Sequence, residues 1–279
     1  MGNKRGQLQC TTQLGVIALE LSDYPRAVAL CNQAHKLSVD IENLRGEAFA
    51  LKLKAEIALT QGSFEISREI FQKARDIFSR ATSIRGQAYC NKGLGDIAMA
   101  EGEVLTAQDQ YTTALSQFRE VGAKHGEASC LKGFGDLAVA SSQWERAERH
   151  YSEALNYYRE IGSKIGEANC HQSLGKLALD RAQTLLAVEH LKSALALYRD
   201  IGHHVSVGWT HMLLMRAVTD DPVRSHHFSE CRKSWTAAGR DDLLAIMNRE
   251  FHDLILRERA SEEDTDATAA LTETEMAGA

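Results

Sequence analysis

Cysteine is the residue type of this sequence best suited to metal or redox chemistry, and its spacing is regular. The six cysteines fall on two registers of a 40-residue period. One register holds Cys10, Cys90, Cys130 and Cys170, and the other holds Cys31 and Cys231. A disulfide or a zinc tetrahedron needs its sulfur atoms a few ångströms apart. Residues a full period apart belong to different structural units, so the spacing favours thiols packed singly in a core.

Histidine could also bind a metal, and two adjacent pairs occur, at His203-His204 and His226-His227. Neither pair has a nearby cysteine or the His-Glu-x-x-His spacing of a helical zinc site. The sequence has no phosphate-binding GxxxxGK[ST] loop, no GxGxxG turn and no GxSxG nucleophile elbow. We therefore expect no metal, no cofactor and no enzymatic activity.

Lysine followed by an acid four residues later recurs in three successive periods. The pairs are Lys52 with Glu56, Lys92 with Asp96, and Lys132 with Asp136. On a helix such a pair can simply neutralise itself, contributing about 0.2–0.5 kcal/mol and no function. Recurrence beside aromatic residues that are costly to expose instead favours a binding surface.

Small side chains that recur with the same 40-residue period predict the helices that position these residues. Helix axes approach to about 8 Å only where side chains are small, and three small registers recur at fixed offsets. Glycines also stand where helices should end, as left-handed C-terminal residues usually do. The first register contains Gly6, Gly46, Gly86, Gly126 and Gly166, and the expected helix ends include Gly62, Gly102, Gly122, Gly162 and Gly202. Each unit is therefore predicted to be a helix–turn–helix hairpin.

One unit makes the resemblance to a known family explicit. The pair Leu94-Gly95 is followed by Ala107, Tyr111 and Ala114, a spacing that resembles the tetratricopeptide repeat. The 40-residue length resembles the arrays of partner-of-inscuteable-type scaffolds and the sensor arrays of signal-transducing NTPases. The resemblance implies an all-α fold, a right-handed α-solenoid of six tetratricopeptide-like repeats followed by a C-terminal capping helix.

The expected organisation has three parts. Residues 1–240 form six repeats, at approximately 6–45, 46–85, 86–125, 126–165, 166–205 and 206–240. Residues 241–259 form the capping helix, because their apolar side chains recur at helical spacing. Residues 260–279 form an acidic tail that is too polar to repay the entropy of ordering, and we expect it to be disordered.

Charge and hydropathy exclude two classes of partner. The net charge is −6, but six acids lie between residues 261 and 279 with no Lys or Arg, and the remaining 32 acids balance 32 bases. Because residues 1–260 carry no net charge, the sequence argues against binding of nucleic acids, including single-stranded RNA. No run of about 18 apolar residues could cross a bilayer, and no apolar leader follows Met1. We expect no membrane partner and a cytoplasmic location.

In arrays of this kind, three registers of each first helix face the inside of the superhelix. The resemblance implies a concave groove there, with a ladder of Lys–acid pairs at its middle and aromatic residues at its flanks. The candidate binding residues are Phe49, Lys52, Glu56, Tyr89, Lys92, Asp96, Lys132, Asp136, Asn169, Gln172, Lys176, Trp209 and Arg216. The remaining groove positions are Gln9, Thr12, Val16, Ser129 and Met212.

The function expected from this groove is that of a non-enzymatic scaffold that holds a peptide or protein segment. A clamp for a bare C-terminal carboxylate would want Asn where Glu56, Asp96 and Asp136 stand. The alternative is the sensor or oligomerisation region of a larger signalling protein, for example a STAND-type NTPase, and self-association is left open. Since the Lys–acid pairs are expected on exposed helix faces, their loss should change stability by only tenths of a kcal/mol.

Overall fold

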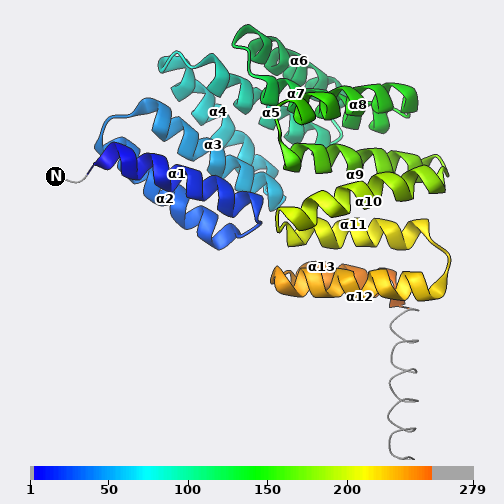
Figure 1. Cartoon of the computed structure of the whole chain (residues 1–279). Coiled ribbons are helices and arrows are strands. Elements are labelled where there is room, and N and C mark those ends of the chain that lie inside the picture. The colour runs from blue at the N-terminus through cyan, green and yellow to red at the C-terminus, as the bar shows by residue number, and fades with distance from the viewer. Residues whose placement is uncertain (1–2, 253–279) are drawn as a thin grey trace, which may run out of the picture. The chain divides into compact units, whose positions relative to one another are not determined.

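The computed structural model describes residues 3–252, and the regular secondary structure in that range is helical throughout, with thirteen helices. The helices are α1 (Lys4–Glu20), α2 (Tyr24–Asp40), α3 (Leu44–Thr60), α4 (Phe64–Arg80), α5 (Ile84–Ala100), α6 (Val104–Glu120), α7 (Lys124–Ala140), α8 (Trp144–Glu160), α9 (Lys164–Asp180), α10 (Thr184–Asp200), α11 (His204–Ala217), α12 (Asp221–Ala237) and α13 (Asp241–Glu250) (Figure 1). The predicted all-α fold is confirmed.

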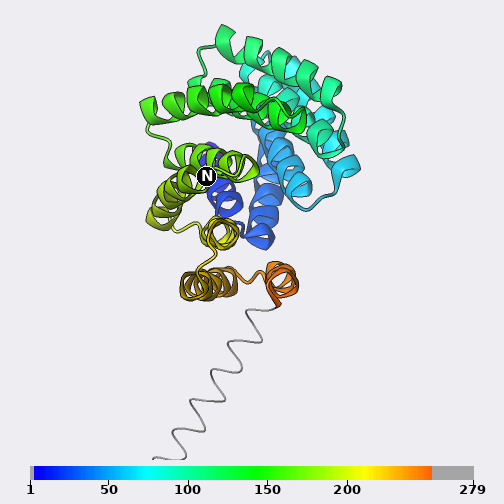
Figure 2. The ribbon, with the colours of Figure 1, turned by 90° about the vertical axis from the view of Figure 1, so that its right-hand side faces the viewer.

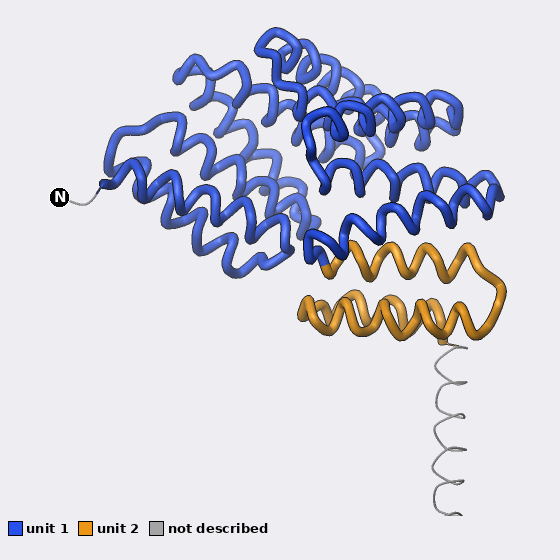
Figure 3. Tube along the Cα trace, in the orientation of Figure 1, with its two compact units in different colours: residues 1–203 blue, residues 204–279 orange. Residues whose placement is uncertain are grey.

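The chain divides into two compact units, residues Met1–His203 and His204–Ala279 (Figure 3). Unit 1 holds α1 to α10 and unit 2 holds α11 to α13. Helix α13 lies within the residues predicted for the capping helix, 241–259. Residues 253–259 of that prediction, and the predicted acidic tail, lie outside the described residues.

Unit 1 is a stack of helix pairs in which each helix packs against the next in the chain. The odd-numbered helices also contact one another, α1 with α3, α3 with α5, α5 with α7 and α7 with α9, so they form a continuous layer. The stack curves, as Figure 2 shows. One cavity is lined both by Leu21, at the end of α1, and by Gly162 and Ser163 of the α8–α9 turn. This architecture is an α-solenoid.

The turns of unit 1 explain why the period is so regular. Helices α1 to α10 each have 17 residues, and three residues separate each from the next. The middle residue of each turn is left-handed, as at Gly62 with φ +74° and Thr82 with φ +51°. The residue after it donates its N–H five residues back, which satisfies a carbonyl at the helix end. Glycine supplies this conformation without strain in five of the ten turns that follow α1 to α10, at the positions predicted.

The repeated glycine at the start of the odd helices is explained by close packing of an aromatic ring from the helix before. A Cβ atom added at any of three of these glycines would clash with that ring. The pairs are Phe78 on Gly86, Phe118 on Gly126 and Tyr158 on Gly166. The later Leu-Gly glycine is used in the same way, since a Cβ at Gly95 would lie 2.6 Å from the ring of Tyr111. The small residue at this register therefore accommodates a tyrosine of the second helix of its own hairpin.

Unit 2 has its own core around Trp235, which is fully buried. The indole Nε1 donates to the carbonyl of Val205 at 3.0 Å, and the ring lies over Gly208. Gly208 on α11 thus accommodates a ring of the helix that follows it, α12, as Gly95 accommodates Tyr111.

Five of the six cysteines are buried in these cores, as expected from their spacing, but Cys10 is exposed. Its equivalents in later hairpins, such as Cys90, are covered by the second helix of the hairpin before. Among the described residues nothing plays that part for α1, and Leu14 and Ile17 on the same helix are also exposed. The expectation of a buried Cys10 is therefore wrong, because burial at this register depends on a neighbouring hairpin.

Candidate functional site

The candidate groove residues of unit 1 lie on its odd helices, and Lys52 on α3 is the most deeply placed of them. Only 8% of Lys52 is exposed. Its ammonium Nζ lies 5.0 Å from the centre of the Phe49 ring and 5.3 Å from that of Tyr89. The same Nζ pairs with Glu56 Oε1 at 2.8 Å. Two rings and one carboxylate therefore hold this lysine in place.

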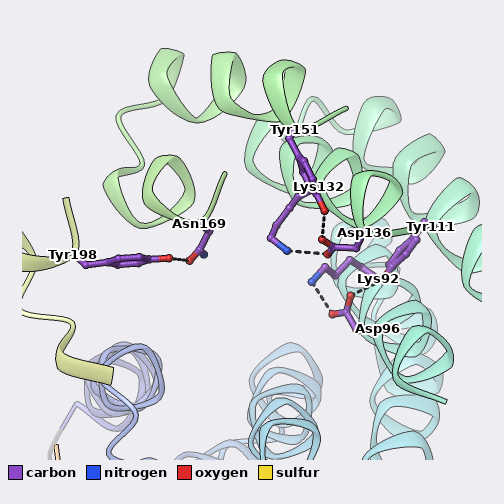
Figure 4. Close-up of polar contacts among 8 residues, drawn as sticks. All are labelled: Lys92, Asp96, Tyr111, Lys132, Asp136, Tyr151, Asn169 and Tyr198. Atoms are coloured by element: carbon purple, nitrogen blue, oxygen red, sulfur yellow. Dashed lines mark hydrogen bonds and ion pairs between the residues drawn. The ribbon is translucent and has the colours of Figure 1, made fainter. Parts of the chain in front are cut away.

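The next two hairpins repeat a different arrangement, in which a tyrosine from the following helix joins the Lys–acid pair (Figure 4). On α5, Lys92 Nζ donates to Asp96 Oδ2 at 2.6 Å. From α6, the hydroxyl of Tyr111 donates to Asp96 Oδ1 at 2.8 Å. Both oxygens of the carboxylate thus have a donor from within the chain.

The α7–α8 hairpin builds the same network from equivalent residues. Lys132 Nζ donates to Asp136 Oδ2 at 2.8 Å, and the hydroxyl of Tyr151 donates to Asp136 Oδ1 at 2.7 Å (Figure 4). An ammonium has three donors, so Lys132 keeps hydrogen-bonding capacity for a ligand. The Lys–Asp–Tyr networks therefore fix the geometry of the surface without exhausting its donors.

The pKa shifts of these groups follow from burial and from the shared carboxylate. Desolvation raises the pKa of Tyr111, and the negative charge of Asp96 raises it further. Desolvation and Asp136 do the same for Tyr151. For Lys92, desolvation lowers the pKa, but Asp96 raises it by more and the net shift is upward. At neutral pH the tyrosines are neutral donors and the lysine is a cation.

In the α9–α10 hairpin the equivalent positions carry different chemistry. The hydroxyl of Tyr198 donates to Asn169 Oδ1 at 2.6 Å (Figure 4). Gln172 is half-buried on α9, and Lys176 is exposed there. As in the two hairpins before, a tyrosine of the second helix donates to a groove residue of the first helix. Here its partner is Asn169 and not a residue at the register of Asp96 and Asp136.

Trp209 and Arg216 belong to unit 2, and the groove is therefore described on unit 1 alone. Trp209 packs edge-on against Trp235, with ring centres 5.3 Å apart. Arg216 Nε donates to Glu250 of α13 at 2.7 Å. Both side chains thus contact residues of their own unit.

Two cavities lie along the odd helices of unit 1. The first, of about 310 Å³, brings together six predicted residues from α3 and α5: Phe49, Lys52, Glu56, Tyr89, Lys92 and Asp96. The second, of about 370 Å³, brings Lys132 and Asp136 together with Lys176. Asn169 and Gln172 line neither.

Several residues of this surface were missed by the sequence reasoning. Tyr111 and Tyr151 were not among the predicted groove residues, although each donates to a groove carboxylate. The sequence signal for this contact is a tyrosine fifteen residues after a groove Asp. The α3–α4 hairpin lacks the signal, because Phe71, which has no hydroxyl, stands fifteen residues after Glu56. Glu20 and His125, which line the first cavity, carried no periodic signal.

Two pairs of histidines meet across helices. The Nδ1 atoms of His171 and His190 lie 3.0 Å apart, and those of His211 and His227 lie 2.9 Å apart. Over residues 3–252, His, Cys, Asp and Glu do not gather in threes in a way that could hold a metal ion. In the same range, no helix has the length and apolar character needed to cross a membrane.

Comparison with known proteins agrees with this architecture. Residues 86–160 match the family model of the tetratricopeptide repeat. No curated protein resembles the sequence closely enough to count as a relative. The predicted resemblance to the tetratricopeptide repeat is confirmed over residues 86–160.

Solved structures share the fold at low sequence identity. A Rap protein complexed with competence and sporulation factor is 15% identical, with 93% of this chain and 74% of that chain covered and a TM-score of 0.71. The Rap conjugation gene regulator of plasmid pLS20, in complex with the Phr* peptide, is 14% identical over 94% and 75%, with a TM-score of 0.70. A STAND protein with a tetratricopeptide repeat sensor from Pyrococcus horikoshii is 13% identical over 94% and 44%, with a TM-score of 0.58.

Proposed function

We propose that unit 1 binds a polypeptide segment along its odd helices and acts as an interaction scaffold without a catalytic step. The observation that carries the proposal is the pair of cavities along α1, α3, α5, α7 and α9. Both combine apolar side chains with ordered charged groups, the mixture typical of polypeptide-binding surfaces.

Preorganisation of the surface supports the same function. A binding site loses affinity when its side chains must be ordered on association. Lys92 and Lys132 are already held by a carboxylate, and each carboxylate is held by a tyrosine from the next helix. Two proteins of similar fold, the Rap protein and the Rap conjugation regulator, are described as bound to competence and sporulation factor and to the Phr* peptide.

The experiment is selection from a displayed library of random peptides, followed by affinity measurement on variants. Phe49→Ala alters the first cavity and Lys176→Glu alters the second. Leu185→Ser is the control, because Leu185 is 90% exposed on α10 and lines neither cavity. We expect selected peptides to lose about tenfold or more in affinity for at least one cavity variant and to keep their affinity for the control. Equal affinity for all three variants, after all are shown to melt normally, would overturn the proposal.

A second proposal is that the chain serves as the sensor or oligomerisation region of a larger signalling protein. The likeness to the STAND protein, of whose chain 44% is covered, supports it. Light scattering of the purified chain with and without a selected peptide separates the two proposals. A peptide-dependent change in oligomeric state favours the sensor, and an unchanged state favours the scaffold.

A further inference from the structure

The first cavity of unit 1 contains a carboxylate, Glu20, with which no cation of the cavity forms an ion pair. Lys52 is paired with Glu56 at 2.8 Å, and Lys92 is paired with Asp96 at 2.6 Å. Glu20, at the end of α1, is exposed and has no hydrogen-bond or ion-pair partner among residues 3–252. It also lines a neighbouring cavity with Lys164, whose ammonium pairs with Asp200. With three carboxylates and two ammonium groups lining it, the cavity has one negative charge in excess.

The remaining titratable groups of the cavity do not compensate this charge. Desolvation lowers the pKa of His125, and Lys92 and Lys52 lower it further, so the imidazole is neutral at pH 7. Tyr89 is also neutral, because burial raises its pKa. For Glu20, desolvation raises the pKa and the negative charge of Glu56 adds to this, while Lys52 acts in the opposite direction. The ionised form of Glu20 would gain from a further cation.

The walls around this carboxylate are apolar and aromatic. Val16 and Leu19 come from α1, and Leu53 comes from α3. Phe49 and Tyr89 add two rings that already lie beside the ammonium of Lys52. Aromatic faces attract cations, and a lysine or arginine side chain combines an apolar stem with a charged head. A cavity of about 310 Å³ with such walls and one excess carboxylate suits that kind of side chain.

We propose that this cavity is the anchor pocket for one cationic side chain, arginine or lysine, of the polypeptide bound by unit 1, with Glu20 as its ion-pair partner. The inference rests on the proposed function and adds to it the chemical class of the anchor.

The test repeats the peptide selection on wild type, Glu20→Gln and Glu65→Gln. Glu65 is exposed on α4 and lines neither cavity, so its substitution changes the net charge equally. Wild type and Glu65→Gln should select peptides with Arg or Lys at one fixed position, and Glu20→Gln should lose that enrichment. Replacing the cation of a selected peptide by norleucine should weaken binding to wild type about tenfold and binding to Glu20→Gln much less.

The outcomes separate this inference from the proposed function. If the affinity of the selected peptides depends on Phe49 or Lys176 but no position of the peptides is enriched in Arg or Lys, the anchor-pocket proposal is wrong and the scaffold proposal is supported. Peptides that depend on neither cavity overturn both. Unfolding does not imitate the expected result, because Glu20 is exposed and makes no ion pair within the described residues, so the melting temperature of Glu20→Gln should be equal to wild type or higher. A clear drop in that temperature would contradict the electrostatic account of Glu20.

Discussion

The hydroxyl of Tyr111 on α6 donates a hydrogen bond of 2.8 Å to the Asp96 carboxylate on α5. This contact joins the two helices of a hairpin at the groove surface, and Tyr151 with Asp136 repeats it in the next hairpin. The groove charges are therefore part of the hairpin's own structure.

Tyr111→Phe should lower the free energy of unfolding by about 1–2 kcal/mol. The substitution removes the donor to a half-buried carboxylate and leaves the ring packing unchanged. Urea denaturation measures the loss. Tyr157→Phe is the control, since Tyr157 is half-buried and has no hydrogen-bond partner in the described range. Equal stability of the two variants would contradict the assigned role of the Tyr111 hydroxyl.

Lys92→Glu should destabilise the fold by about 1–2 kcal/mol, more than the tenths expected from the sequence. Lys92 and Asp96 are each only 27% exposed, and the new carboxylate would face the old one. Lys176→Glu makes the same charge change at an exposed site of α9 and should cost less than about 0.5 kcal/mol. Chemical denaturation of both variants measures their free energies of unfolding. Equal losses would show that the Lys92–Asp96 pair contributes no more than an exposed surface pair.

Stability should fall as the pH rises above about 9. Burial raises the pKa of Cys130 from 9.0 to about 12, so in this range the unfolded chain loses a proton that the folded chain keeps. The free energy of unfolding then decreases with pH, by at most about 1.4 kcal/mol per unit for each such thiol. Cys130→Ala should therefore lose about 1 kcal/mol less than wild type between pH 8 and pH 10. Parallel losses in the two proteins would argue against a protonated, buried thiol.

Gly126→Ala should destabilise unit 1 by about 1–3 kcal/mol. The added methyl group would clash with the ring of Phe118, and the gain in helix propensity offsets only about 1 kcal/mol. Gly6→Ala is the matched control at the same register, where the nearest side chain is the exposed cap Asn3. Thermal melts should show a large loss for Gly126 and almost none for Gly6.

Iodoacetamide should label one cysteine of the folded protein rapidly. Cys10 is exposed, whereas the other five are buried, and burial raises the pKa of Cys31 to about 11 and of Cys90 to about 12. Thiolate is the reactive form, so buried thiols with high pKa values react slowly. Mass spectrometry should find one modification under native conditions and six after unfolding. Rapid labelling of a second cysteine would show that a hairpin opens.

The sequence by itself determined the helical hairpins of this protein, their 40-residue period and the positions of the turns that contain glycine. These features depend on local rules: small residues where helices approach, and glycine where the chain turns left-handed. Gly62 has the left-handed backbone expected at a helix end, and Gly126 has the close packing against a neighbouring helix expected of a small residue. The Lys–acid pairs were also visible, because four residues make one turn of helix.

Only the tertiary structure decided what surrounds those pairs. Tyr111 reaches Asp96 across a turn and from a second helix, and the exposure of Cys10 depends on whether a hairpin covers α1. Glu20 enters the first cavity because the odd helices form one layer, which brings residues from four hairpins together. Such contacts depend on the angle and distance between packed helices, and sequence spacing along one helix does not specify either.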